Sequence, residues 1–541
     1  MPSARLPRRR GGALSVLFLA LLSLVTATTT APPATAEAPG RPVVDTDRGQ
    51  VRGRAHGTYD TFEGIPFAAP PTGPLRWRPP APVRRWQGVR DAGAPGASCP
   101  QLPALGPGKM SGSEDCLSLN LTRPAERGRG RPVMVWLHGG GFIQGTGRDY
   151  AAQRLAVGGG AVVVTVNYRL GVLGFFGHPG LDAPALGIAD QQAALRWVRA
   201  NAARFGGDPG NVTLFGESAG ALSTCAQLTS PSARGLFHRA VIQSGSCMTV
   251  VPKNAGDPGS AAFHPWTPRE RTRAAGAEAA RALGCGRGAR ALRCLRALPV
   301  EKLVTPELTE EFAAVPYGDA LLPRRPDRAL ESGRFHRVPV IQGANLDEMR
   351  SLLAQALVDH PIPDGRAYRA RLGATFGASA AAVERRYPVG KYPTPALAWA
   401  TLLTDRVWIC PTQRGNRALA AHVPTYGYEF ADRNAPVFGG FPPPAPGFPY
   451  GAAHGFELPY LFDLPTVTPF TAPQRELSER MTGYWTRFAR TGDPNEPGAP
   501  RWPAFRGGAP LVQYLAPGTG GIRPGNAGAA HGCAFWDRLR V

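Results

Sequence analysis

Residues 211–220 have the sequence NVTLFGESAG, and the part FGESAG around Ser218 decides the fold. The apolar run before it predicts a strand over 211–215, and AGALSTCAQL after the serine predicts a helix. Gly-x-Ser-x-Gly at a strand-to-helix junction is typical of a turn that presents a nucleophilic serine. The glycines are needed because the strand and the helix approach each other closely there. Ser218 is therefore a candidate nucleophile.

The segment from about Arg131 to Gly245 alternates expected strands with expected helices. RPVMVWLHGGG and AVVVTVNY are continuous apolar runs, as in strands that are buried on both faces. ADQQAALRWVRANAARF has apolar residues at helical spacing, and RAVIQSG and VPVIQGAN are further strand-like runs. This rhythm predicts an α/β fold: a mostly parallel central sheet with helices on both faces and long loops.

Composition limits the classes of function. The chain has 541 residues, of which 43% are hydrophobic, so it can bury a large core despite its 67 glycines and 57 prolines. Its formal net charge is +22, carried mostly by arginine. A nucleic-acid partner would favour a basic stripe interleaved with aromatic residues, and the sequence has none. We therefore interpret the charge as arginines scattered over the surface and expect no nucleic-acid partner.

The N-terminus is typical of a secretory signal peptide. Arginines among the first ten residues precede an apolar run over 13–25, and Ala34-Thr35-Ala36 fits a small-x-small cleavage site. The apolar run is shorter than the roughly 20 residues that span a bilayer. We expect residues 1–36 to be a signal peptide, residues 37–541 to form a single domain, and the mature protein to be secreted without stable membrane insertion.

If the chain is exported, its cysteine count can be interpreted. An even number of cysteines in an exported chain indicates disulfides, although the sequence alone leaves their pairing open. No pair has zinc-site spacing with nearby histidines, so no metal is expected. The eight cysteines are Cys99, Cys116, Cys225, Cys247, Cys285, Cys294, Cys410 and Cys533.

An acyl-transfer site also needs hydrogen-bond donors for the developing oxyanion, an acid and a base. HGGGF at 138–142 follows an expected strand, and a glycine-rich loop in this place can supply backbone N–H groups to an oxyanion hole. VPVIQGANLDE places Asp347 and Glu348 directly after a later strand. The base must follow the acid along the chain, and chain spacing leaves His454 and His531 open.

Motifs over nearly the whole mature length point to one family. They are FEGIPFAAPPTGPLRWRPPAP, SEDCLSLN, HGGGF, NYRLGVLGF, GIADQQAALRWV, LFGESAGALS, GANLDEM, GAAHGFELPYLF and YWTRFARTGDPN. In this order and spacing the chain resembles the type B carboxylesterases, the cholinesterase-like family of the α/β-hydrolase fold. The composition suggests a bacterial, secreted member.

The resemblance implies the site residues: Ser218, Glu348 and His454 as catalytic residues, with Gly140, Gly141 and Ala219 as oxyanion-hole donors. It implies no cofactor and no metal. It also implies disulfides Cys99–Cys116, Cys285–Cys294 and Cys410–Cys533, which leaves Cys225 and Cys247 either as a fourth bridge or as two buried thiols. Arg76 with Glu114 and Arg169 with Asp190 match structural ion pairs of the family.

The chain departs from the family pattern in two places, and the first of them bears on the expected substrate. Residues 100–115 contain no aromatic side chain, so the cation–π site for choline is missing, and Met349 replaces a small residue after the acid. We expect a secreted serine carboxylesterase acting on small-molecule esters of short to medium chain. The alternatives are a lipase or amidase on the same fold, or a non-catalytic binding module. The oligomeric state stays open.

Overall fold

The structure is a computed structural model that describes residues 40–103, 108–439 and 441–539. The chain divides after Gly40, and every element below belongs to the unit that begins at Arg41. The expected signal peptide, residues 1–36, lies outside the described residues.

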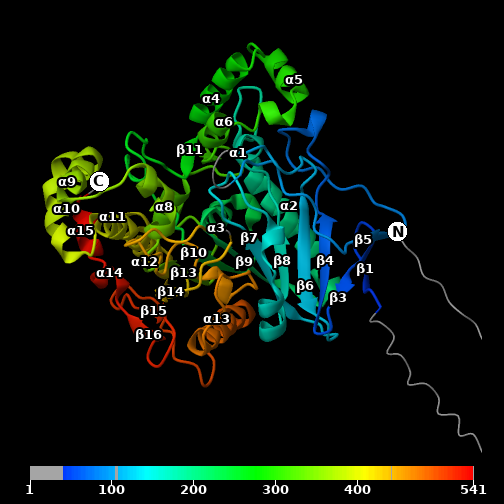
Figure 1. The fold of residues 1–541 in the computed structure, drawn as a ribbon. Coiled ribbons are helices and arrows are strands. Elements are labelled where there is room, and N and C mark those ends of the chain that lie inside the picture. The colour runs from blue at the N-terminus through cyan, green and yellow to red at the C-terminus, as the bar shows by residue number, and fades with distance from the viewer. Residues whose placement is uncertain (1–39, 104–107, 440, 540–541) are drawn as a thin grey trace, which may run out of the picture. The chain divides into compact units, whose positions relative to one another are not determined.

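An eleven-stranded sheet forms the centre of this unit (Figure 1). The strands from β15 to β8 in the sheet order pair in parallel, whereas the pairs beyond them at both edges are antiparallel. The sheet order is β16 (Arg523–Gly525), β15 (Val512–Leu515), β14 (Thr425–Phe430), β13 (Val340–Asn345), β10 (Arg239–Gln243), β9 (Gly207–Glu217), β7 (Arg131–Leu137), β8 (Val162–Val166), β6 (Ser118–Pro124), β4 (Tyr59–Pro66) and β3 (Arg54–Ala55). The predicted mostly parallel α/β sheet is confirmed.

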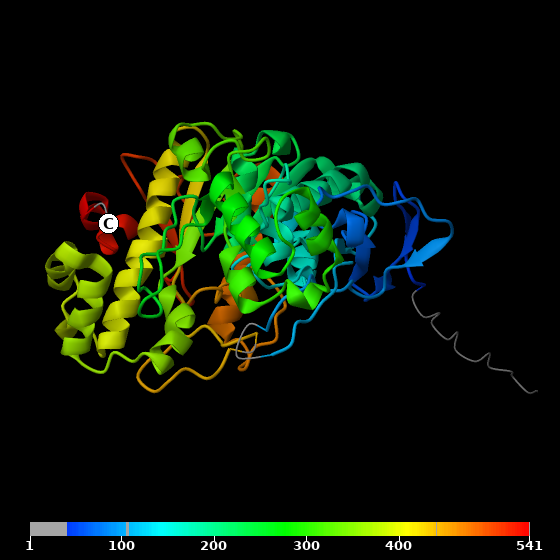
Figure 2. The same ribbon diagram turned by 90° about the horizontal axis from the view of Figure 1, so that it is seen from above.

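Both faces of the central strands are buried. Along β7, Val133 and Val135 belong to one apolar core, whereas Met134 and Trp136 belong to another. Helix α3 (Ala219–Thr229) packs on β9 and β10 on the first face, and α13 (Ala472–Thr491) packs on β7 and β9 on the second (Figures 1 and 2). The apolar runs of the sequence are continuous because successive side chains of a central strand enter opposite cores.

The other helices and the small sheets complete the unit. The remaining α-helices are α1 (Gly171–Phe175), α2 (Leu186–Asn201), α4 (Arg269–Ala282), α5 (Ala289–Ala297), α6 (Pro306–Glu311), α7 (Pro326–Glu331), α8 (Met349–Asp359), α9 (Gly365–Phe376), α10 (Ala380–Arg386), α11 (Pro395–Leu403), α12 (Cys410–Ala420), α14 (Ala527–Ala530) and α15 (Cys533–Leu539). The π-helices are η3 (Arg154–Gly158) and η9 (Thr404–Ile409). The 3₁₀ turns are η1 (Gly73–Leu75), η2 (Gly147–Asp149), η4 (Ala202–Phe205), η5 (Pro231–Ala233), η6 (Val300–Lys302), η7 (Gly377–Ser379), η8 (Val389–Lys391) and η10 (Leu458–Tyr460). The small sheets are β1 (Val43–Asp45) with β2 (Gln50–Arg52) and β5 (Val89–Asp91), and β11 (Trp266–Pro268) with β12 (Val315–Tyr317).

Helix α13 shows how local signals set a boundary. The run ERMTGYWTRFARTG at 479–492 predicts a helix with Met481, Trp485 and Phe488 on one face, and all three are fully buried. The helix begins earlier because Thr471 and Gln474 form a capping box that adds two turns. None of the helices within the described part of the chain has both the length and the apolar character required to cross a lipid bilayer.

Four disulfides link the described cysteines. Cys99–Cys116, Cys285–Cys294 and Cys410–Cys533 are the predicted pairs. The open question about the other two cysteines is resolved, since Cys225 in α3 pairs with Cys247, which follows β10. No described cysteine is free.

The ion pair between Arg169 and Asp190 is buried within the scaffold. Arg169 donates from Nε and Nη2 to the two carboxylate oxygens of Asp190, at 2.8 and 2.7 Å, and the side chains are only 3% and 0% exposed. A bidentate pair of this kind compensates the loss of hydration only while both partners are present.

We predict that Arg169→Met lowers the free energy of unfolding by about 3–5 kcal/mol, because it leaves the Asp190 charge buried and unpaired. Chemical denaturation monitored by tryptophan fluorescence measures this loss. The control is Arg328→Met, whose partner Glu331 and own side chain are 47% and 69% exposed. That change should cost no more than about 0.5 kcal/mol. Equal losses in the two variants would contradict the prediction.

Candidate active site

Ser218 lies on a strained turn between β9 and α3. Its backbone has φ 54° and ψ −120°, a conformation that costs free energy for any residue with a side chain. A Cβ at Gly216 would lie 2.6 Å from the Gly220 carbonyl carbon, and a Cβ at Gly220 would collide with the carbonyl oxygen of Leu137. The glycines of the motif are therefore required by space, as the sequence predicts.

A second serine nearby shows what distinguishes Ser218. Ser244, at the end of the neighbouring strand β10, also has a positive φ, 49°, but it is fully buried. Ser218 is partly exposed within a run of buried residues, and its N–H donates to the Gln243 carbonyl oxygen at 3.0 Å. The turn thus fixes the backbone of Ser218 while leaving its side chain accessible.

Glu348 and His454 form a buried pair. Glu348 follows β13 and is fully buried, and its Oε2 lies 2.5 Å from Nδ1 of His454. The other carboxylate oxygen accepts the Asn345 N–H at 2.7 Å, so both oxygens are held. Asp347, the alternative acid, instead pairs with Arg433.

His531, the histidine that chain spacing left open, lies in a different cluster. Its Nδ1 is 2.6 Å from Asp405 Oδ1 and its Nε2 is 2.9 Å from Glu429 Oε2. Each ring nitrogen of His531 therefore contacts a carboxylate of this cluster, and neither contacts Glu348. The structure brings His454, and not His531, to the acid.

Glu217 faces the other side of the His454 ring. Its Oε1 lies 3.1 Å from Nε2, and among the described residues no hydrogen bond joins this ring to the Ser218 hydroxyl. Burial raises the pKa of Glu217 to about 8. Burial opposes the charged form of His454, but the carboxylates of Glu217 and Glu348 outweigh it and raise the pKa of the imidazole to about 9.

Glu457 is a third carboxylate that the sequence reasoning missed. It is fully buried, and burial raises its pKa above the ordinary value. Asn345 connects it to the pair, because its Nδ2 donates to Glu457 Oε2 at 2.6 Å while its N–H donates to Glu348. Gln243 donates to the other oxygen of Glu457 at 3.2 Å. The only signal in the sequence was its place three residues after His454.

Trp408 was also missed, and it covers the imidazole. Its ring centroid lies 4.5 Å from that of His454, and its Nε1 donates to Met349 Sδ at 3.1 Å. Met349, the departure from the family pattern, thus contacts the tryptophan that covers the histidine. Trp408 belongs to the π-helix η9, a kind of distortion that is frequent at functional sites.

The glycine-rich loop after β7 lies against the serine. A Cβ at Gly139 would be 3.1 Å from the Ser218 Cβ, and Gly140 and Gly141 have φ of 101° and 64°. Outside the regular helix and strand ladders, no described hydrogen bond uses the N–H of Gly140, Gly141 or Ala219. These N–H groups are the donors that the sequence predicts for an oxyanion.

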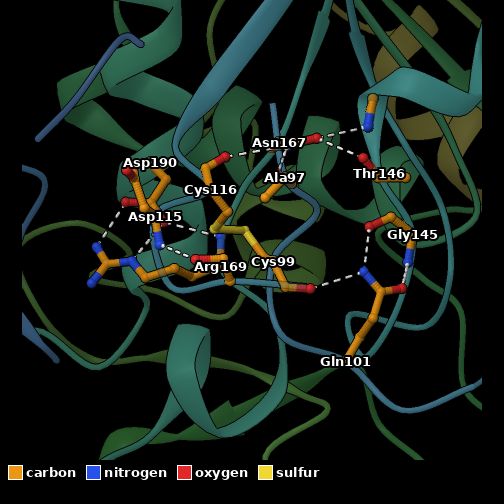
Figure 3. The surroundings of a disulfide bond; sticks show 12 residues. Ala97, Cys99, Gln101, Asp115, Cys116, Gly145, Thr146, Asn167, Arg169 and Asp190 are labelled. Carbon is orange, nitrogen blue, oxygen red and sulfur yellow. Dashed lines mark hydrogen bonds and ion pairs between the residues drawn. A yellow bond between two sulfur atoms is a disulfide. The ribbon is translucent and has the colours of Figure 1, made fainter. Parts of the chain in front are cut away.

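Residues next to the Cys99–Cys116 disulfide contact Gly145 and Thr146, which follow this loop (Figure 3). Gln101, close to the bridge, exchanges two hydrogen bonds with Gly145: it accepts from the Gly145 N–H at 2.8 Å and donates to the Gly145 carbonyl at 3.1 Å. Asn167 donates to the Cys116 carbonyl and accepts from the Thr146 hydroxyl. The hydrogen bonds of Gln101 and Asn167 therefore fix the residues that follow the loop, close to the disulfide.

The described residues contain no group of three or more His, Cys, Asp or Glu arranged to hold a metal ion. A serine on a strained turn after a parallel strand, an acid after a later strand and a histidine beyond it define the class of protein: an α/β-hydrolase.

Comparison with known proteins places the chain within that class. Residues 40–536 match the profile of the Carboxylesterase family. The chain is 36% identical over 514 residues to Carboxylesterase 3 of Pongo abelii, which covers 88% of this chain and 87% of that protein. It is 34% identical over 501 residues to Cocaine esterase of Oryctolagus cuniculus, with 86% and 90% covered. The chain belongs to the carboxylesterase family and is a carboxylic ester hydrolase.

We predict that Glu217→Gln lowers the pKa of His454 from about 9 towards the ordinary value of 6.5, because it removes a carboxylate that stabilises the imidazolium. Nuclear magnetic resonance titration of ¹⁵N-labelled histidine measures the change, and a His454→Gln sample assigns the signal. Glu479→Gln, at an exposed glutamate, should leave the titration unchanged. An unaltered His454 titration in Glu217→Gln would refute the electrostatic coupling.

Proposed function

We propose that this chain is a secreted serine carboxylesterase that hydrolyses esters of short to medium chain through an acyl-enzyme on Ser218. One observation supports the proposal: His454, which is paired with the buried Glu348, contacts Glu217, the chain neighbour of the accessible Ser218, and a Cβ at Gly139 in the glycine-rich loop would lie 3.1 Å from the Ser218 Cβ. Such a meeting of nucleophile, base and oxyanion donors is what acyl transfer requires.

In the proposed first half-reaction, Nε2 of His454 takes the proton of the Ser218 hydroxyl while Oγ attacks the ester carbonyl. The N–H groups of Gly140, Gly141 and Ala219 stabilise the oxyanion, and losing one such donor typically costs about 3–4 kcal/mol of transition-state stabilisation. The imidazolium then gives its proton to the departing alcohol. Glu348 holds the tautomer and stabilises the positive charge.

In the second half-reaction, His454 takes a proton from water, which attacks the acyl carbonyl. Collapse of this intermediate releases the carboxylic acid, and the proton returns to Ser218. Nε2 of His454 faces Glu217, the neighbour of Ser218 in the chain. Hydrogen bonds of a catalytic pair often form fully only when substrate is bound.

Secretion is part of the proposal and rests on two features. The basic, apolar and small-residue order of residues 1–36 is typical of a signal peptide. The four disulfides of the described chain are of a kind that persists in oxidising compartments.

We predict that the wild-type protein hydrolyses p-nitrophenyl esters from acetate through the medium chain lengths, with lower rates towards palmitate. Ser218→Ala should reduce kcat at least about 10⁴-fold, because nucleophile, base and acid act as a unit. Initial rates of p-nitrophenolate release measure both effects, and the unfolding midpoint shows that the variant is folded.

Ser244→Ala is the matched control, because this serine also has a positive φ at a strand end but is buried. It should retain activity of the wild-type order. Loss of activity only in Ser244→Ala, or no turnover of any chain length by folded wild-type protein, would overturn the proposal. A rate that peaks at palmitate would favour a lipase, and amide turnover with inert esters would favour an amidase.

A further inference from the structure

Hydrogen bonds join two segments that meet at the Glu348–His454 pair, the turn after β13 and the loop that ends at His454. The Asp347 N–H donates to the Ala452 carbonyl at 2.9 Å, and the His454 N–H donates to the Glu348 carbonyl at 3.2 Å. The imidazole belongs to one segment and the acid to the other. The distance between them therefore depends on how the loop is held against the turn.

The side chain of Asp347 adds a further bond to this contact. Its Oδ2 accepts the Ala452 N–H at 3.1 Å, so the two residues exchange two hydrogen bonds. A carboxylate makes a stronger bond to a backbone N–H than a neutral acceptor does. Gly451 leaves room for it, because a Cβ on this glycine, which has φ 62°, would collide with the carboxylate. Asp347 thus holds the loop two residues before His454.

Two arginines hold the Asp347 carboxylate, which is only 4% exposed. Arg350 Nη2 lies 2.7 Å from Oδ1, and Arg433 donates from Nε to Oδ2 at 3.0 Å. Arg350 also donates to the Pro449 carbonyl at 3.1 Å, so it contacts the loop as well. The two positive charges compensate the hydration that the buried carboxylate loses. They keep its oxygens in the orientation that reaches Ala452.

Other side chains that contact the loop hold different atoms of it. Asn345 Nδ2 donates to the Ala453 carbonyl at 2.7 Å, and the Ser351 hydroxyl donates to the His454 carbonyl at 3.3 Å. Among the described residues, the Ala452 N–H has only the Asp347 carboxylate as acceptor. Ala452 is fully buried, so without this carboxylate its N–H would lack a partner unless the loop moved.

We propose that Asp347 is a positioning residue for ester hydrolysis, because its carboxylate holds the His454 loop where Nδ1 meets Glu348. The proposal rests on the proposed catalytic roles of His454 and Glu348. Nδ1 lies 2.5 Å from Glu348 Oε2, and a catalytic group misplaced by about 1 Å can lose about 100-fold in rate. Of the two adjacent acids after β13, Glu348 contacts the base and Asp347 fixes the loop that carries it.

Steady-state kinetics of Asp347→Ala with p-nitrophenyl butyrate tests this role. We expect kcat to fall about 100-fold while KM changes less than about threefold, because the base and not the substrate is displaced. Asp347→Asn keeps the side-chain volume and one oxygen, and its kcat should fall about tenfold. This second variant decides the question if Asp347→Ala does not fold.

The titration of ¹⁵N-labelled His454 separates positioning from support of the fold. In folded Asp347→Ala the pKa of His454 should fall from about 9 towards 6.5. Burial disfavours the imidazolium, and the imidazolium would have lost the contact with Glu348 that opposes this effect. A residue that only supported the fold would leave the titration of the folded protein unchanged.

Asp60→Ala is the matched control. Asp60 is also buried, at 6% exposed, and its Oδ2 accepts from Arg123 Nε and Nη2 at 3.1 and 3.0 Å. It lies on β4, near the β3 edge of the sheet and away from β13. Its removal should lower the unfolding midpoint but keep kcat within about twofold of wild type.

Equal kcat losses in Asp347→Ala and Asp60→Ala, or a wild-type kcat in a folded Asp347 variant, would overturn the positioning role. Ser218→Ala, measured beside them, separates this result from failure of the proposed function. If Ser218→Ala stays active, the proposed function fails and the positioning role fails with it. If Ser218→Ala is inactive while both Asp347 variants keep the wild-type kcat, only the positioning role is refuted.

Discussion

The close approach of strand β9, helix α3 and the end of strand β7 is the constraint on which the rest of the site depends. Gly216 and Gly220 meet at a separation that leaves no space for a Cβ, and Gly220 also touches the Leu137 carbonyl. This one contact places the strained Ser218 and the start of the glycine-rich loop next to each other. The same contact therefore positions the nucleophile and the oxyanion donors. The packing around Ser218 maintains its strained backbone conformation.

The second constraint is electrostatic. Three buried carboxylates, those of Glu217, Glu348 and Glu457, surround one imidazole, an arrangement that would be costly without hydrogen bonds to hold it. Asn345 supplies several of them: it bonds to Glu348 and Glu457 and to the Ala453 carbonyl beside His454. The carboxylates around His454 stabilise the imidazolium that forms when it takes a proton during acyl transfer.

Much of the fold could be predicted because its signals are local. Continuous apolar runs identify strands that are buried on both faces, and the motif around Ser218 carries its own steric reason. The predicted helix of ERMTGYWTRFARTG was too short because its start depends on a capping box outside the apolar pattern. The disulfide between Cys225 and Cys247 depends on how α3 packs beside β10, which no spacing rule contains.

The site was predicted less completely, because it depends on contacts between segments that are distant in the sequence. His454 and His531 each lie between two carboxylates, so their immediate surroundings are alike, and only their distance from Glu348 separates them. Only the family resemblance chose His454 from the sequence. Trp408 comes from a segment that is remote in the chain from His454, and a single sequence has no local signal for such a contact.

The most direct test of the account is to map the covalent adduct of a fluorophosphonate probe, which reacts with activated serines. Intact mass spectrometry should show one adduct per chain, and peptide mapping should place it on Ser218, with no labelling of Ser218→Ala or of the heat-unfolded protein. An adduct on another serine, or a folded protein that does not react, would contradict the claim that the turn at Ser218 creates the nucleophile.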